Sequence, residues 1–380
     1  MEPNLKLLPE INSPVPFSDL SWQWHAIEKK FLSEFANLAD KGQFCLGPAV
    51  ERFENEFAEF VGARHAIGVN SGTSALHLAL IVAGIKPGDK VLIPAQTFIA
   101  TAWPLLYIGA TPILCDVEAA TGNINISDAK KRWQPGTKAI IPVHLYGQPA
   151  DMNALLAFAA EHELTVVEDA CQAHGATYND KQVGTMGLLG CYSFYPGKNL
   201  GALGEAGMIV TSDDALAERM RSLRHHGQRE RYIHHEIGYN YRMEGIQGLA
   251  LAHKLAHLVE WNKLRKHIAN RYIKGLAGLP LALPETIHQD HVYHLFIVRT
   301  SQRENLRLWL EKHHIATGLH YPVPLHRQPC LSHLAVDQSS FPVADHYSND
   351  GLSLPIFPGM EEVQVDAVIE AVHRFFENVK

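Results

Sequence analysis

The chain has 380 residues, of which 46% are hydrophobic and 19% charged, and its formal net charge at pH 7 is -7. The length suits one large domain plus a smaller one, and the composition excludes a disordered or fibrous chain. A negatively charged chain has no overall attraction for nucleic acid or anionic membranes, so a bound phosphate must be met by local groups. We therefore expect a small-molecule ligand and neither a nucleic-acid nor a membrane partner.

Short runs of branched apolar residues alternate with helical patterns in the first part of the chain, which is typical of βαβ units and a mostly parallel sheet. In the clearest helix, Leu76, Leu80 and Ala83 stand at helical spacing, and Gly84 marks its end. The predicted strands cover residues 66–70, 90–95, 111–117, 139–145, 164–169, 190–195 and 207–212.

The pattern changes near residue 244, and the remaining segments indicate a second, smaller α+β domain. The predicted elements there are a helical run at 244–274, a strand at 291–300, a helix near 303–313, a loop at 331–345 and a closing helix from about 361. The predicted domains are an N-terminal arm at 1–22, a large domain at 23–255 and a small domain at 256–380.

The cysteines and the apolar runs bear on the cellular compartment. The longest apolar runs, such as residues 78–85, are too short to cross a bilayer, and the first residues do not form a signal peptide. An odd number of cysteines without a CxxC pair argues against a disulfide framework and a zinc site. The five cysteines are Cys45, Cys115, Cys171, Cys191 and Cys330. These features predict a cytoplasmic protein without a metal.

Ligands of open parallel sheets bind at the carboxyl ends of the strands, which makes the residues after each strand informative. The run AIGVN ends in Asn70 and leads into Ser71, Gly72, Thr73 and Ser74 at the start of a helix. The small side chains and free backbone N–H groups of this turn suit a phosphate. A plain helix cap formed by Ser71 or Thr73 is the commoner explanation of such a segment, and both interpretations stay open.

Within the run VVEDACQAHG, a predicted buried strand ends at Glu168 and Asp169. A buried carboxylate is costly unless a positive group meets it. A protonated pyridine nitrogen would be such a partner, and the pairing would keep a pyridoxal ring electron-withdrawing. A helix cap or a structural ion pair is the alternative, and the segment alone does not decide between them.

The run CYSFYPGKNLGALGEAG places Lys198 among glycines after a strand. Partial burial would lower the pKa of its amine toward the neutral form that a Schiff base requires. The same amine could later move a proton between a substrate carbon and a cofactor carbon. Ser193 could donate its hydroxyl to a phosphate. A lysine in a loop is more often solvated, so the segment does not establish catalysis by itself.

Two other glycine motifs are excluded in this run. A Walker loop would need glycine where Tyr192 stands and serine or threonine where Asn199 stands. The glycines at positions 201, 204 and 207 follow a GxxGxxG spacing, which is not the dinucleotide fingerprint. Nucleotide hydrolysis and hydride transfer therefore lose their main sequence support.

An ordered set of segments resembles the DegT/StrS-type sugar aminotransferases, which have the aspartate-aminotransferase-like fold type I of pyridoxal-phosphate enzymes. The segments are SGTSALHLAL, PAQTFIATA, HLYGQPADM, VVEDACQAHGA, YSFYPGKNLGALGEAG, GYNYRMEGIQ and LHYPVPLHRQP, in this order. The resemblance extends from about residue 20 to about residue 375. It implies an α/β fold with helices on both faces of a mostly parallel sheet, and pyridoxal 5'-phosphate as cofactor.

The resemblance also implies roles for single residues. Lys198 matches the lysine that holds the cofactor, Asp169 the partner of its pyridine nitrogen, and Gln172 a residue near its ring hydroxyl. Phe98 matches a ring stacked on the cofactor. Contacts to the phosphate are implied for Gly72, Thr73, Ser193 and, from the neighbouring subunit of a homodimer, Asn240. Relatives with histidine at the lysine position catalyse dehydration, so Lys198 favours transamination.

The substrate implied by the resemblance is a nucleotide-linked keto sugar, with an amino acid, L-glutamate, as donor. The segment GLHYPVPLH, with His320 and Tyr321, looks most like the branch that aminates a C3 ketone. A C4 ketone, a cyclitol, or a non-catalytic regulatory role on the same fold are the alternatives. Arg224, Arg229 and Arg231 could meet a substrate diphosphate or could be solvated.

Overall fold

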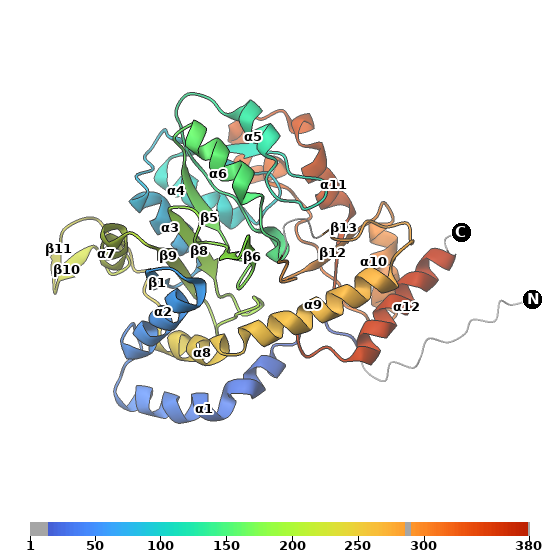
Figure 1. Cartoon of the computed structure of the whole chain (residues 1–380), viewed down its shortest axis with the longest axis horizontal. Coiled ribbons are helices and arrows are strands. Elements are labelled where there is room, and N and C mark those ends of the chain that lie inside the picture. The colour runs from blue at the N-terminus through green and yellow to red at the C-terminus, as the bar shows by residue number, and fades with distance from the viewer. Residues whose placement is uncertain (1–13, 286–289, 379–380) are drawn as a thin grey trace, which may run out of the picture.

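A seven-stranded sheet forms the centre of the computed structural model, which describes residues 14–285 and 290–378 (Figure 1). β9 pairs antiparallel with both of its neighbours, and all other adjacent strands are parallel. In spatial order the strands are β1 (His65–Val69), β9 (Gly207–Thr211), β8 (Leu189–Ser193), β5 (Thr165–Asp169), β4 (Thr137–Ile140), β2 (Lys90–Pro94) and β3 (Thr111–Cys115). The predicted mostly parallel sheet is confirmed.

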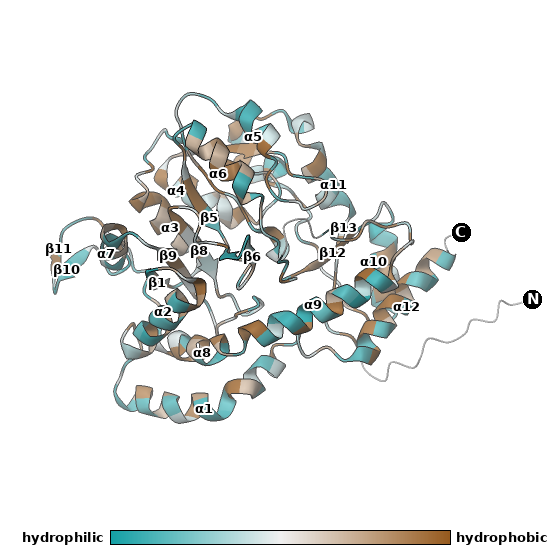
Figure 2. Cartoon of the chain, in the orientation of Figure 1, coloured by the Kyte–Doolittle hydropathy of each residue, from teal (hydrophilic) through white to brown (hydrophobic). Residues whose placement is uncertain are grey.

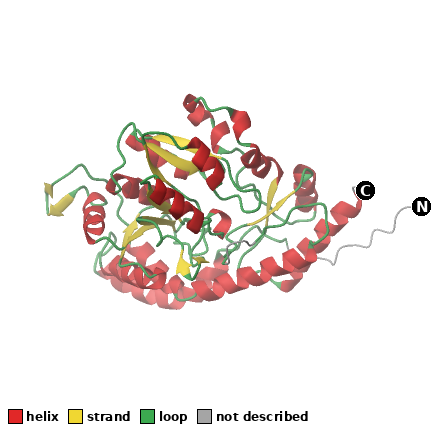
Figure 3. Cartoon of the chain, turned by 45° about the horizontal axis from the view of Figure 1, so that its top comes forward, coloured by secondary structure: helices red, strands yellow, loops and turns green. Residues whose placement is uncertain are grey.

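Helices cover both faces of this sheet (Figure 3). Successive side chains of a strand point to opposite faces, so Leu92 and Ile93 of β2 enter different cores. One face is covered by α2 (Pro48–Val61), α5 (Ile126–Arg132), α6 (Met152–Glu161) and α8 (Gly245–Leu255). The other is covered by α3 (Gly72–Val82), α4 (Trp103–Ile108) and α7 (Asp214–Leu223).

A separate core lies among the later elements, where a two-stranded antiparallel sheet packs against three helices. These are β12 (Phe296–Arg299), β13 (Gly351–Leu354), α9 (Leu258–Gly275), α10 (Arg303–Lys312) and α12 (Glu362–Asn378). α9 and α10 are largely hydrophilic, whereas the central strands and α3 are hydrophobic (Figure 2). The division at residues 255 and 256 stays a prediction, and residues 1–13 of the predicted arm lie outside the described residues.

The remaining elements are short or peripheral. α1 (Ser21–Asp40) packs Ile27 and Phe31 against α8. A hairpin of β10 (Gln228–Glu230) and β11 (Ile233–His234) projects beyond α7 (Figure 1). The others are β6 (Thr177–Tyr178), β7 (Lys181–Gln182), α11 (Pro342–Asp350) and 3-10 helices at Ile99–Thr101, Leu145–Gly147, Leu325–Arg327, Pro329–Leu334 and Gln338–Ser340. None of the helices in the described part combines the length and apolar character needed to cross a bilayer.

The predicted helical run at 244–274 is wrong in one respect, because two helices replace one. α8 ends at Leu255 and α9 begins at Leu258, although no glycine or proline stands between them. α8 and the first residue of α9, Leu258, pack in the core of the large sheet, whereas Ile268 and Tyr272 of α9 pack in the separate later core. Tertiary packing therefore sets this break, and helix propensity does not reveal it.

The predicted loop at 331–345 is also wrong, since it contains two 3-10 helices and the start of α11. Asp116, more than two hundred residues earlier, accepts the backbone N–H groups of Val343 (3.1 Å) and Ala344 (2.9 Å). A carboxylate that accepts the free N–H groups of the first turn stabilises a helix start. Because Asp116 is so distant in sequence, no local signal marks this helix.

The predicted strand at 139–145 is too long, because β4 ends at Ile140. Pro142 follows, and proline has no N–H to donate to a neighbouring strand. Its carbonyl still accepts the N–H of Asp169 at 2.9 Å. The chain therefore runs on beside β5 without forming a regular ladder.

Candidate active site

A cavity of about 700 Å³ lies at the carboxyl ends of the parallel strands, between the sheet and residues from the later part of the chain. The residues predicted from sequence that line it are Gly72, Thr73, Phe98, Asp169, Gln172, Ser193, Lys198, His320 and Tyr321. The structure thus brings together side chains that are up to 249 positions apart, from Gly72 to Tyr321. Two predicted site residues, Asn240 and Arg229, do not line this cavity.

Lys198 lies in the loop after β8, where its side chain is half-buried. Burial lowers the pKa of its amine, and the nearby Cys171 and Asp169 oppose that shift. No hydrogen bond or ion pair joins the amine to any residue in the described ranges. A lysine in this environment has an enlarged neutral fraction, which is the form that attacks a carbonyl.

Three hydrogen bonds tie the loop that carries Lys198 to its surroundings. The buried Asn199 side chain donates to Asn262 Oδ1 at 2.9 Å and to the Val292 carbonyl at 3.0 Å. Lys254, on α8, donates from Nζ to the Gly201 carbonyl at 2.7 Å, and burial lowers its pKa to about 8. Asn199, which stands where a Walker loop would need serine or threonine, therefore has a structural role and holds the loop against α9.

Asp169 is the last residue of β5, and its side chain is buried at the cavity wall. One carboxylate oxygen accepts the hydroxyl of Thr101 at 2.9 Å, and the other accepts the N–H of Cys171 at 3.2 Å. No ion pair joins Asp169 to another residue in the described part of the chain. The alternative of a structural ion pair therefore has no support, whereas the contact with Cys171 is a local turn cap.

Glu168 faces the opposite side of the sheet and is fully buried. Its carboxylate accepts the backbone N–H groups of Gly184, Met186 and Gly187 at 2.6–2.7 Å, and it pairs with His144 Nε2 at 3.0 Å. All of these contacts lie outside the cavity. The two adjacent carboxylates therefore have different environments, and Glu168 serves the fold.

Replacing Glu168 with glutamine is expected to lower the free energy of unfolding by about 3 kcal/mol or more, because the amide NH2 would face backbone N–H donors and leave them unpaired. Urea denaturation of the cofactor-free protein measures the loss. Glu161→Gln, at an exposed glutamate on α6, is the control and should change stability little. Equal stability of both variants would contradict the structural assignment.

The start of α3 meets the end of β8 at the cavity wall. The Ser71 side chain accepts the N–H of Ser74 at 3.1 Å and caps the helix. The first turn still presents N–H groups without an intrahelical partner, at Gly72 and Thr73. A Cβ added to Gly72 would stand 2.6 Å from Ser193 Cβ, so only glycine fits here. The helix-cap interpretation is therefore confirmed for Ser71, and the phosphate interpretation stays a prediction for a helix start that suits an anion.

Aromatic and polar side chains close the other side of the cavity. The Phe98 and Tyr321 rings lie 5.4 Å apart, and Phe98 is 48% exposed, which leaves its face open to a ligand. Gln172 accepts the N–H of Tyr146 at 2.7 Å and donates to the Tyr321 hydroxyl at 3.1 Å. His320 contacts Ser353 Oγ at 2.7 Å, and burial lowers its pKa to about 4, so its ring is neutral at pH 7.

The predicted residues outside the cavity lie around the projecting hairpin. Asn240 is exposed beside His225. Arg229 is exposed on β10, 3.6 Å from Glu218, and Arg231 lies over the Tyr232 ring. Arg224 is instead buried, where it pairs with Glu54 and donates to the Gly68 carbonyl, so neither diphosphate binding nor solvation describes it.

Several cavity residues were not identified from the sequence. Thr101 stands in the segment PAQTFIATA, and its contact with Asp169 could have been suspected there. Arg265 on α9, His294 before β12 and Glu205 after the Lys198 loop also line the cavity. Arg265 and His294 come from segments whose pattern indicates only helix and strand.

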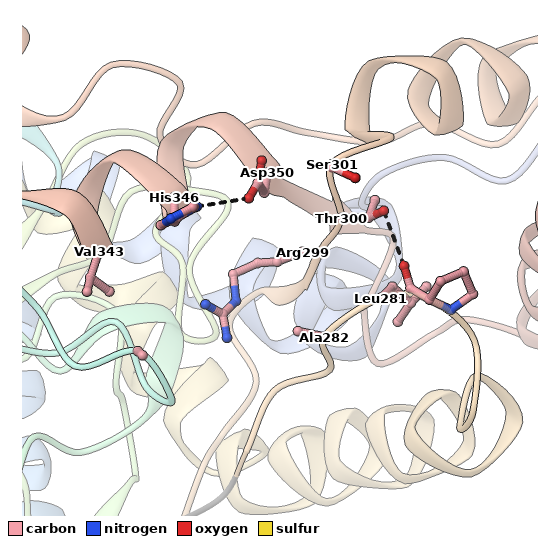
Figure 4. A pocket seen from close by; sticks show the side chains of 10 residues that line it. Leu281, Ala282, Arg299, Thr300, Ser301, Val343, His346 and Asp350 are labelled. Atoms are coloured by element: carbon pink, nitrogen blue, oxygen red, sulfur yellow. Dashed lines mark hydrogen bonds and ion pairs between the residues drawn. The ribbon is translucent and has the colours of Figure 1, made fainter.

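A second depression, of about 410 Å³, lies between β12 and α11 and is separate from Lys198 (Figure 4). Its polar groups largely pair with one another, as in His346 with Asp350 at 3.3 Å and Thr300 with the Pro280 carbonyl at 3.3 Å. The Arg299 guanidinium lies over the Tyr347 ring at 4.4 Å. It contains no lysine or cysteine nucleophile, so the larger cavity is the candidate active site.

Comparisons with known proteins agree with this architecture. A model of the DegT/DnrJ/EryC1/StrS aminotransferase family matches residues 25–373. The dTDP-3-amino-3,4,6-trideoxy-alpha-D-glucose transaminase of Streptomyces venezuelae is 44% identical over 96% of this chain and 97% of its own. The UDP-N-acetyl-3-dehydro-alpha-D-glucosamine 3-aminotransferase of Acidithiobacillus ferrooxidans is 40% identical over 96% and 98%. A pleiotropic regulatory protein of Geobacillus stearothermophilus is 40% identical over 96% and 99%.

Two solved structures are also similar. The crystal structure of S. venezuelae DesV in complex with a ketimine intermediate has a TM-score of 0.94 at 44% identity, over 97% of this chain and all of that one. Bacillus subtilis NtdA with bound cofactor PMP has a TM-score of 0.89 at 30% identity, over 96% of this chain and 86% of that one. The predicted fold is confirmed.

Proposed function

Because this chain belongs to the DegT/DnrJ/EryC1/StrS family of sugar aminotransferases, we propose that it transfers the amino group of L-glutamate to the C3 ketone of a nucleotide-linked sugar, with pyridoxal 5'-phosphate as cofactor. The observation that carries the proposal is the meeting of Lys198, Asp169 and the start of α3 in one cavity. These groups supply an amine, a carboxylate and an anion-binding turn.

The residues fit the cofactor by their chemistry. When bound, pyridoxal phosphate supplies an aldehyde that condenses with amines and a ring that withdraws electrons from the reacting carbon. Gly72, Thr73 and Ser193 would hold the phosphate at the start of α3, where a larger residue than Gly72 would collide with Ser193. Asp169, kept in place by Thr101, would hold the proton on the pyridine nitrogen.

Lys198 would bind the aldehyde carbon through Nζ. Once the amino donor displaces it, the free Nζ would carry a proton between the substrate carbon and the cofactor carbon. Phe98 and Tyr321 would shield the ring from water, and Gln172 would orient its hydroxyl. The donor would give up its amino group and leave as a keto acid. The keto sugar would then take the amino group by the same proton movements in reverse.

Two names among the relatives support the C3 position, since one denotes a 3-amino sugar transaminase and the other a 3-aminotransferase acting on a 3-dehydro sugar. The test incubates purified protein with L-glutamate and a panel of C3 and C4 keto nucleotide sugars, with a cyclitol ketone for comparison. Amination of the C3 ketones at the highest kcat/KM is expected. Preference for a C4 ketone or a cyclitol would replace the substrate but keep the reaction.

A second candidate is a regulatory protein of the same fold, which the name of the Geobacillus relative favours. Such a protein could bind the cofactor without exchanging amino groups. A single-turnover assay with the cofactor-loaded protein and L-glutamate separates the two, because only an aminotransferase converts its cofactor and releases 2-oxoglutarate.

We also propose a homodimer in which Asn240 contacts the phosphate in the partner's site. In support, Asn240 is exposed and away from its own cavity, and exposed apolar side chains stand in the adjacent hairpin, at Tyr232 (77%), and just after it, at Ile237 (90%). Exposed apolar side chains of this kind mark an interaction surface. Mixing Lys198→Ala chains with Asn240→Ala chains should restore part of the activity if each site uses both subunits. No recovery in a verified mixed dimer would contradict shared sites.

Gly72→Ala is expected to weaken pyridoxal phosphate binding by about tenfold or more, because an extra methyl in a tight contact costs on the order of 1–3 kcal/mol. A titration followed by cofactor absorbance measures the affinity. Gly197→Ala is the matched control, since a Cβ there meets only ordinary contacts with the Tyr195 ring, 3.5 Å away. Equal affinities of the two variants would count against a phosphate at the start of α3.

The lowered pKa of Lys198 predicts how cofactor attachment depends on pH. Only the neutral amine attacks the aldehyde, so the rate of attachment should rise with pH and level off above the pKa. Because burial disfavours the charged form, the midpoint should lie below the ordinary lysine value of 10.5. Stopped-flow absorbance at a series of pH values measures the profile, and a midpoint at or above 10.5 would contradict it.

A further inference from the structure

Arg265 is a buried cation in the wall of the candidate active site, with no role in the mechanism above. It projects from α9, is 4% exposed, and lines the same cavity as Lys198. Burial lowers the pKa of its guanidinium to about 10, so it remains charged at pH 7. A buried charge normally has a counter-charge, but no ion pair joins Arg265 to a residue in the described ranges.

The hydrogen bonds of Arg265 use only one of its three nitrogens. Nη1 donates to the carbonyls of Tyr293 (3.2 Å), His294 (3.4 Å) and Ile356 (3.0 Å). Nε is buried and has no partner among the described residues, and no bond from Nη2 to these residues is present either. Native structures rarely leave a buried donor unpaired. Because Arg265 also lines the cavity, a group bound there from outside the chain can meet its free donors.

The free donors have the geometry that a carboxylate requires. In a guanidinium, the N–H of Nε and one N–H of Nη2 lie side by side on one edge and match the two oxygens of a carboxylate. The carbonyls fix the opposite side through Nη1, which holds the plane of the group. Arg265 is therefore oriented before a ligand binds, and its unused edge is the one suited to bidentate binding.

Arg265 is also the one permanent cation of the cavity wall, apart from Lys198, among the described lining residues. His294 and His320 stand nearby, but burial lowers the pKa of both rings, so they are neutral at pH 7. The charges of Lys198 and Arg265 both act on His294, so both cations lie near one imidazole. A small anion bound to Arg265 thus lies near the reacting amine.

We propose that Arg265 binds the α-carboxylate of the amino donor through Nε and Nη2, and so makes the cavity selective for α-amino acids. The inference rests on the proposed function. The α-carboxylate is attached to the carbon that reacts, so its receptor must belong to the same cavity as Lys198, as Arg265 does. The proposed phosphate site at the start of α3 consists of other residues of the wall, so the two anions would have separate receptors.

The test uses cofactor-loaded protein and the donor half-reaction alone, without any keto sugar. Absorbance follows conversion of the cofactor by L-glutamate, by its γ-amide L-glutamine, and by its α-amide L-isoglutamine. Wild-type protein should discriminate against the α-amide by about 100-fold, which is the scale of losing one partner of a buried charge pair. In Arg265→Gln and Arg265→Lys, that discrimination should fall to within a few-fold.

Binding without turnover gives a second measurement, with 2-methyl-L-glutamate as a donor that has no α-hydrogen to transfer. Its dissociation constant should rise about 100-fold in Arg265→Gln, while the affinity for pyridoxal phosphate stays unchanged. Arg303→Lys is the matched control, because Arg303 also donates from Nη1 to backbone, at the Ser348 carbonyl, and has an unpaired buried Nε, but it lies outside the cavity. It should behave as wild type.

The outcomes separate the two proposals. Full α-amide discrimination retained in folded Arg265→Gln, or discrimination against the γ-amide alone, would overturn the role of Arg265 and leave the aminotransferase intact. Wild-type protein that reacts with none of the amino acids would overturn the proposed function itself.

Discussion

Lys198→Ala is expected to abolish turnover, because it removes both the covalent anchor of the cofactor and the proton carrier. Loss of the proton carrier alone costs about 10²–10⁴ in rate, and loss of the anchor adds to it. The fold should be unaffected, since no contact of the amine with the described residues is lost and Asn199 still holds the loop. Multiple-turnover transamination from glutamate measures the effect.

A chemical signature accompanies the loss of rate. Borohydride reduction of wild-type protein with its cofactor should leave an adduct on Lys198, and the variant should carry none. Lys181→Ala, at an exposed lysine of β7, is the control and should retain both the adduct and the activity. Turnover of Lys198→Ala within tenfold of wild type, or an adduct on another lysine, would remove Lys198 from the mechanism.

Asp169→Asn is expected to reduce the rate by about 10²–10³, the usual cost of losing one electrostatic partner of the reacting system. The substitution can preserve the local contacts. The amide oxygen can accept the N–H of Cys171, and the amide NH2 can donate to Thr101, whose hydroxyl can turn toward Thr97 Oγ1 at 2.9 Å. The variant therefore isolates the charge of Asp169 from its shape.

The experiment measures cofactor affinity, melting temperature and kcat on the same preparation. A folded variant that binds cofactor but has lost rate supports the assignment to the pyridine nitrogen. An unchanged kcat would exclude Asp169 from the chemistry, and a large drop in melting temperature would show that its structural contacts dominate.

The parts of the site that follow a strand in sequence could be predicted from local pattern. Lys198, Asp169 and Gly72 stand at the end of a strand or a few residues after it, where parallel strands deliver residues to one edge of the sheet. The family resemblance gave them roles that spacing alone left open. The local contacts of Ser71 and Asp169 are visible only in the folded chain, because helix capping and ligand binding use the same small polar residues.

The parts that could not be predicted depend on partners far away in the sequence. Arg224 looked like a surface cation, yet it is buried because Glu54, 170 positions earlier, pairs with it. Asp116 caps a helix that local propensity assigns to a loop. Arg265 follows the helical pattern of α9 like any core-facing residue, and only the fold reveals that it ends at the cavity.

Because Glu168 and Asp169 are adjacent carboxylates with different roles, the chemistry of the cavity depends on the register of one strand, β5. Neighbouring residues of β5 face opposite sides, so a shift of a single position would turn each of the two side chains to the other face of the sheet. The longer glutamate would then point into the cavity. The aspartate would face the backbone N–H groups that Glu168 now binds, and its side chain is too short to reach them. A one-residue insertion or deletion within this strand would therefore abolish the reaction even if Glu168 and Asp169 were both retained, because each side chain would face the wrong side of the sheet.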